Sequence, residues 1–145
     1  MGILSLQNLF SNAQAITATA VSTNIIDLGA AGTPYGAAAA LNGDVGAGAR
    51  IPLFFVVTEA FNTLTSLAVA LEMSASSDLS SSTVLSTQSI ALASLVVGKR
   101  LNLTVLPQNI TQRYLGMRYT VTGSNPSTGK ITSGIGFNQT NITGA

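Results

Sequence analysis

The chain has no cysteine, no histidine and no tryptophan among its 145 residues. Without cysteine it has no disulfide, no thiolate metal site and no cysteine nucleophile. Without histidine it has no imidazole-based catalytic triad, and the common zinc and copper sites lose their usual ligand. We therefore expect a protein that is not an enzyme and that binds no metal and no cofactor.

Charge is also scarce. The sequence has 6 basic and 5 acidic residues, 8% charged residues in all, and a formal net charge of +1. The basic residues are scattered along the chain, and only Lys99 and Arg100 are adjacent. A phosphate-binding face needs several basic side chains together. We therefore expect no nucleic-acid partner.

A mean hydropathy of +0.45 with so little charge is unusual for a protein that stays soluble as a free monomer. Either a membrane or neighbouring proteins must cover much of the surface. The most apolar window, 51–71, contains Pro52, Glu59 and Asn62, and Glu59 would lie near the middle of a bilayer. The N-terminal residues also lack the basic start of an export signal. We expect no membrane association and a surface covered by partners.

Period-two patterning of Thr, Val, Ile and Leu dominates the chain and predicts an all-β protein. In 113–122, for example, Leu115, Met117 and Tyr119 share one strand face, and Arg118 and Thr120 share the other. Turn residues separate the expected strands, which are 16–21, 25–28, 51–59, 64–74, 84–95, 101–106, 113–122 and 130–137. We expect a jelly-roll-like antiparallel β-sandwich that forms a single domain over 1–145.

Three segments fall outside this pattern. Residues 1–14 are expected to form an N-terminal arm, and 138–145 a C-terminal tail. Residues 29–50 contain 6 glycines and 8 alanines and are expected to form a long flexible loop. Within the sandwich, 51–59 and 64–74 are expected to pair as a hairpin.

The long loop and the basic pair are the candidate partner contacts. Tyr35 and Arg50 lie in the loop, and tyrosine and arginine are enriched at protein interfaces. Lys99 and Arg100 form the one basic pair. We expect these side chains to contact a partner.

The sequence gives little support for a catalytic carboxylate pair, a phosphate-binding loop or a sugar pocket. Glu59 and Glu72, on the expected hairpin, would lie ~23 Å apart at ~3.3 Å per residue, too far for a glycosidase pair. The segment 123–130 has the wrong spacing for a phosphate loop. Tyr114 and Arg118 share an outer strand face about 13 Å apart and would form a surface rather than a sugar pocket. A carbohydrate-binding jelly roll remains an alternative.

The sequence resembles a family of tailed-phage capsid cement proteins, of the type found on a Bordetella podophage. The resemblance rests mainly on the N-terminal run Leu4-Ser5-Leu6-Gln7-Asn8-Leu9-Phe10-Ser11-Asn12-Ala13-Gln14-Ala15-Ile16-Thr17-Ala18-Thr19-Ala20, continued in 22–29. It resumes at 51–53, at 57–61 and at 113–123.

The resemblance implies a jelly-roll protein that dimerises and bridges major capsid proteins. We therefore expect a structural cement or decoration protein on the outer surface of a phage capsid, made in the host cytoplasm. Its expected partners are the major capsid protein and a second copy of itself, with a dimer favoured over a trimer. The alternative is a lectin-like binding module of a phage fibre or surface appendage.

Overall fold

The structure is a computed structural model that describes residues 5–41, 48, 50–101 and 105–136. Its strands are β1 (Leu9–Ala15), β2 (Ala20–Val21), β3 (Ile26–Asp27), β4 (Leu53–Glu59), β5 (Leu64–Ser74), β6 (Thr83–Ala91), β7 (Tyr114–Gly123) and β8 (Lys130–Ile135). Two short 3-10 helices are η1 (Leu6–Asn8) and η2 (Leu92–Ser94). Within these described residues, no helix is long and apolar enough to span a membrane.

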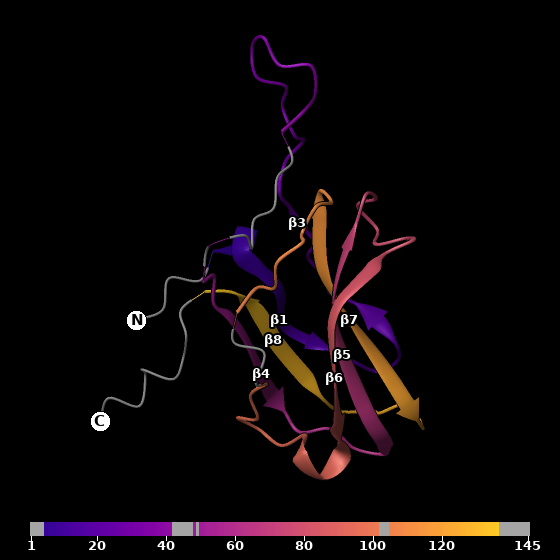
Figure 1. The fold of residues 1–145 in the computed structure, drawn as a ribbon. Coiled ribbons are helices and arrows are strands. Elements are labelled where there is room, and N and C mark those ends of the chain that lie inside the picture. The colour runs from indigo at the N-terminus through magenta and orange to yellow at the C-terminus, as the bar shows by residue number, and fades with distance from the viewer. Residues whose placement is uncertain (1–4, 42–47, 49, 102–104, 137–145) are drawn as a thin grey trace, which may run out of the picture.

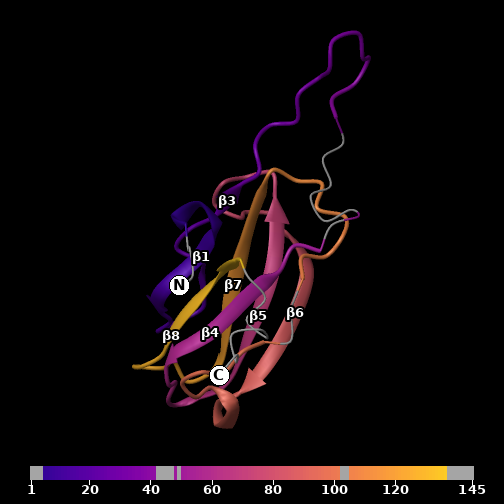
Figure 2. The ribbon, with the colours of Figure 1, turned by 90° about the vertical axis from the view of Figure 1, so that its left-hand side faces the viewer.

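The strands form two antiparallel sheets packed face to face (Figures 1 and 2). One sheet has the order β1-β8-β4. In the other, β7 lies between β5 and an outer strand made of two short pieces, β2 and β3, and β6 lies beyond β5. The predicted all-β antiparallel sandwich is therefore confirmed, while the jelly-roll connectivity stays a prediction.

Strand β7 shows how the sequence pattern places the core. Leu115, Met117 and Tyr119 are at most 1% exposed and face the other sheet, while Arg118 and Thr120 point outward. This is the division of faces that the alternation predicts. The core as a whole draws on both sheets, and its largest fully buried side chains are Tyr119, Phe10, Ile16, Leu67, Leu71, Leu95, Ile110, Leu115, Met117, Ile131 and Val57.

A buried polar chain joins the two sheets across this core. The Tyr119 hydroxyl lies 2.7 Å from Ser11 Oγ on β1 and 2.8 Å from Ser133 Oγ on β8. Ser11 Oγ donates its hydrogen to Gln14 Oε1, so Tyr119 must donate to Ser11, and Ser133 to Tyr119. Burial raises the pKa of the Tyr119 hydroxyl, because the low-dielectric interior disfavours the phenolate.

The predicted hairpin of 51–59 and 64–74 is wrong. Both strands exist, but β4 pairs with β8 in one sheet, and β5 pairs with β6 and β7 in the other. The chain therefore crosses between the sheets at 60–63, where Phe61 is 7% exposed and its backbone N–H donates to Leu95 O. Both strands have an apolar face, and the crossing buries both faces in one core.

The expected N-terminal arm is also too long. Residues 9–14 belong to β1, which pairs with β8, and Phe10 is fully buried. The expected strand 16–21 shrinks to β2, because Ile16 turns into the core at the end of β1. Polar residues alternate irregularly in β1, whose register is interrupted twice, and this hides its period from the sequence.

The remaining boundaries differ by smaller amounts. Strand β6 ends at Ala91, where η2 begins, rather than at residue 95. Of the expected strand 101–106, residues 102–104 lie outside the described residues. Val105 forms an isolated bridge to Pro52, just before β4, and Arg100 forms one to Val56 on the outer edge of β4. The loop over 29–50 leaves the sandwich beyond β3, and its described residues from 29 to 41 are all exposed (Figure 1). The expected tail at 138–145 lies outside the described residues.

Candidate functional site

The carboxylates at Glu59 and Glu72 lie on different sheets, and each is engaged in an ion pair. Glu72, on β5, is 4% exposed, and both of its oxygens lie 3.0 Å from Arg118 Nε on β7. Ser82 Oγ also donates to Glu72. Arg118 further donates to Leu79 O, so this pair fastens the 75–82 connection onto the outer face of the sheet. The ~23 Å separation, which assumed a hairpin, does not apply.

Glu59 pairs with Lys130 at 2.9 Å across the β4–β8 ladder, and both side chains are more than two-fifths exposed. The Lys130 ammonium and the Gly129 N–H lower the pKa of the Glu59 carboxyl. Among the described residues, no three acidic side chains gather into a group that could hold a metal ion.

Asp27 and Arg113 form a bidentate pair where β3 meets the start of β7, with both N···O distances at 2.7 Å. The Arg113 hydrogen bonds, together with the Gly29 N–H, lower the pKa of Asp27 to about 2. The Arg113 guanidinium also lies 5.1 Å from the centre of the Tyr114 ring. Tyr114 and Arg118, the residues considered for sugar contact, are therefore both engaged with neighbouring side chains.

The candidate contact residues lie at two ends of the sandwich. Residues 29–41 form the continuous described part of the long loop, which we call the 29–41 excursion, and Tyr35 is fully exposed on it. Arg50 is exposed shortly before β4. Lys99 and Arg100 lie beside the far part of β4, where Lys99 O accepts from Val57 N–H and Arg100 bridges Val56. Residues 50 and 56 are six positions apart along an extended chain, which puts their Cα atoms about 20 Å apart. The structure therefore does not gather these residues into one site.

Near Lys99 and Arg100, the structure adds two residues that the sequence analysis missed. Val96 and Val97 are 53% and 65% exposed, in the turn that follows η2. Two large apolar side chains beside two basic ones form a mixed surface of the kind that proteins use for docking. We call Val96, Val97, Lys99 and Arg100 the basal turn; it lies at the end of the sandwich opposite the 29–41 excursion (Figure 1). The adjacent valines in the sequence were the signal for it.

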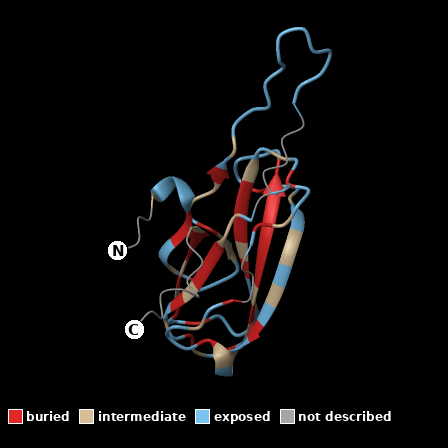
Figure 3. Cartoon of the chain, turned by 60° about the vertical axis from the view of Figure 1, so that its left-hand side comes forward, coloured by how far each residue is buried: buried red, intermediate tan, exposed pale blue. Residues whose placement is uncertain are grey.

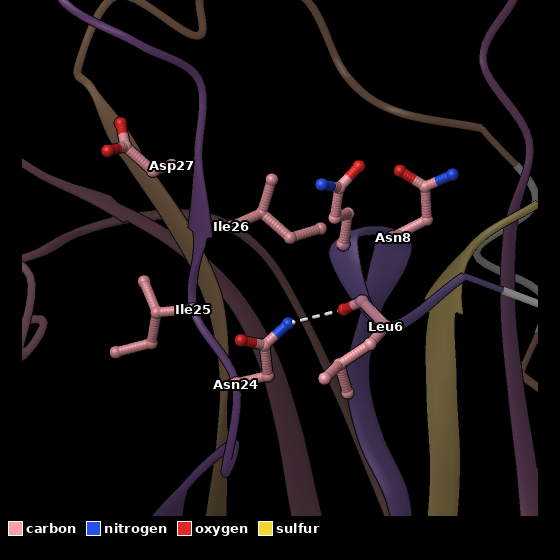
Figure 4. A pocket seen from close by; sticks show the side chains of 7 residues that line it. Leu6, Asn8, Asn24, Ile25, Ile26 and Asp27 are labelled. Atoms are coloured by element: carbon pink, nitrogen blue, oxygen red, sulfur yellow. Dashed lines mark hydrogen bonds between the residues drawn. The ribbon is translucent and has the colours of Figure 1, made fainter.

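A surface hollow of about 590 Å³ lies at the root of the excursion, between η1 and the segment that enters β3. Its lining side chains, shown in Figure 4, come from Leu6, Gln7, Asn8, Asn24, Ile25, Ile26 and Asp27. Asn24 Nδ2 donates to Leu6 O and Leu9 O, and Asp27 is paired with Arg113. Asn24 and Asp27 are thus engaged within the fold, and the hollow is lined by polar and apolar side chains alike, among them Leu6, which is 70% exposed.

Comparison with known proteins places the chain in a family. A family model named Bbp16 matches residues 10–135, which is nearly the whole described sandwich. No curated protein matches the sequence. The chain therefore belongs to the Bbp16 family, whose name points to a protein of a Bordetella phage.

Proposed function

We propose that this protein is a structural cement protein that binds the outside of a phage capsid and bridges neighbouring copies of the major capsid protein. Membership of the Bbp16 family over residues 10–135 carries this proposal. The resemblance of the N-terminal run to capsid cement proteins supports it independently of the fold. The proposed role is mechanical and requires no catalytic group, metal or cofactor.

The shape of the molecule fits bridging. The 29–41 excursion with Tyr35 lies at one end of a stiff two-sheet sandwich, and the basal turn lies at the other (Figure 1). Two separated contact surfaces on one rigid body can hold two capsid subunits at a set distance. Each contact can be modest, because the second forms at the high effective concentration that the first creates. A homodimer, which we also propose, would present each surface twice.

Cementing has a thermodynamic consequence. A ligand that binds the assembled lattice and not the separated subunits stabilises the lattice by its binding free energy, summed over many copies. Shells that carry this protein should therefore survive heating and osmotic shock that open shells without it, with their geometry unchanged. Electron microscopy after a heat step, with and without added protein, measures this directly.

Variants at the two ends test the bridging geometry. Tyr35→Ala and Val97→Asp should each reduce shell protection, while Thr122→Ala, on the exposed outer face of β7, serves as a folded control. Equal survival of stripped and complete shells would refute cementing. Binding of the isolated protein to glycans, with no effect on shells, would instead support the lectin-like alternative.

A further inference from the structure

Strand β6 is a long edge strand with an open side. It ends the order β2-β7-β5-β6, pairs with β5 over eight positions, and has one buried residue, Ile90, among its nine. Figure 3 shows it at the rim of the sandwich, with exposed and intermediate residues along most of its length. In the part of the chain that the structure describes, no backbone bond joins its outer side to another segment.

The other edges are covered or short. The β1 edge is covered because Phe10 O accepts from Asn24 N–H at 2.9 Å and Leu9 O accepts from Asn24 Nδ2 at 2.6 Å. The edge formed by β2 and β3 is short, since each piece has two residues, and Gln14 Nε2 on β1 donates to Val21 O on β2 at 2.9 Å.

The β4 edge is covered by the chain that follows the basal turn. Gly98 N–H donates to Val57 O at 2.8 Å, and Val57 N–H donates to Lys99 O at 3.0 Å. Further along, Leu106 N–H donates to Ile51 O. Among the described edges, β6 is therefore the long one left open.

The sequence of β6 does nothing to block a partner strand. Natural edge strands are protected by charges, prolines or bulges, because their unpaired N–H and C=O groups can otherwise pair with another chain. From Leu79 to Gly98 the sequence has no charged residue and no proline. The one irregularity in the β5–β6 register falls between the Leu71↔Ser86 and Glu72↔Val84 pairs, which leaves 86–91 regular.

We propose that β6 is the homodimer interface, in which the β6 strands of two copies pair antiparallel about a two-fold axis and join their larger sheets into one. A strand that pairs along β6 must itself offer open backbone N–H and C=O groups, and in the described part of the chain β6 is the long edge that does so. Self-pairing brings no like charges together, since neither strand has any. This interface specifies the dimer that the proposed function includes, and its β-pairing satisfies the free backbone groups.

The proposal predicts that one added charge on the exposed face of β6 breaks the dimer. Ser89 lies near the middle of the regular stretch 86–91, so in an antiparallel pair centred on that stretch Ser89→Lys puts one cation from each strand beside the two-fold axis. Like charges so close weaken association at least about tenfold. Thr120→Lys is the matched control. Ser89, Ala68 and Thr120 are cross-strand neighbours in one row of the sheet. Ser89 and Thr120 are both exposed, but Thr120 lies two strands away from the edge.

Sedimentation velocity across a dilution series measures the outcome, with thermal melting to confirm that each variant folds. Wild type and Thr120→Lys should sediment at twice 14.7 kDa, and Ser89→Lys should shift to the monomer. Because the chain has no cysteine, Ser89→Cys supplies a single thiol and should oxidise to a covalent dimer, whereas Thr120→Cys should not.

A wild-type monomer at all concentrations overturns the proposal, and so does a Ser89→Lys variant that dimerises like wild type. Shell binding is scored separately. If the wild type never binds shells although Ser89→Lys still breaks its dimer, cementing is refuted and the interface is kept. If the wild type protects shells but Ser89→Lys remains dimeric, cementing is kept and the interface is refuted.

Discussion

Replacing Tyr119 by phenylalanine removes one oxygen atom from the middle of the sandwich and leaves the packing of the ring in place. The Tyr119 side chain is fully buried, and its hydroxyl bonds to Ser11 and Ser133 on the opposite sheet. Each neutral hydrogen bond contributes about 1 kcal/mol net, so losing two destabilises the fold by about 2 kcal/mol. At about 2–4 °C per kcal/mol for a domain of this size, the melting temperature should fall by about 4–8 °C.

Differential scanning calorimetry at neutral pH measures this shift. Tyr114→Phe, on the same strand but half-buried on the outer face, is the control and should change stability by less than about 0.5 kcal/mol. A Tyr119→Phe variant that melts like wild type would show that the polar chain between the sheets contributes nothing to stability. An equal loss in both variants would show that the position of the hydroxyl does not matter.

The same pair of proteins gives a pH test. The pKa of Tyr119 is raised in the folded state by burial, so above about pH 10 the unfolded chain releases the phenolic proton first. The stability of wild type should therefore fall as the pH rises past 10. Phenylalanine has no proton to lose, so the gap between wild type and Tyr119→Phe should narrow there. A gap that stays constant up to pH 11 would contradict the assignment.

Three further changes test other parts of the structure. Asp27, whose pKa is about 2 beside Arg113, contributes stability that is present above pH ~4 and lost as the pH falls toward 2. In the Asp27→Asn variant the melting temperature should therefore depend less on pH over that range. Arg118→Met leaves Glu72 buried without its cation and should cost about 2 kcal/mol by urea unfolding, whereas Lys130→Met breaks a half-exposed pair and should cost less than about 1 kcal/mol. Gly129→Ala would force a methyl group into the Phe61 ring at a positive φ, and should lower the melting temperature well beyond Gly98→Ala, where φ is also positive but the space is open.

Much of the fold was predictable from local sequence. The alternation in 113–122 correctly assigned the faces of β7, because a strand repeats every two residues whatever its partners are. Strands β4, β5 and β8 were placed within two residues of their ends for the same reason. Turn residues at 75–82 and 124–129 correctly separated strands, since the backbone preferences of turns are local.

The pairing of these strands was decided by the tertiary structure. The sequence at 60–63 is compatible both with a hairpin within one sheet and with a connection that crosses to the other sheet. The crossing was decided by burial of two apolar strand faces in one core. Charge partners were equally hidden, since Glu72 and Arg118 are 46 residues apart in sequence. The open edge of β6 also had no local sign, because an edge is open only when no distant segment reaches it. Sequence alone determined the local period, while contacts between remote segments determined which edges and surfaces remain for partners.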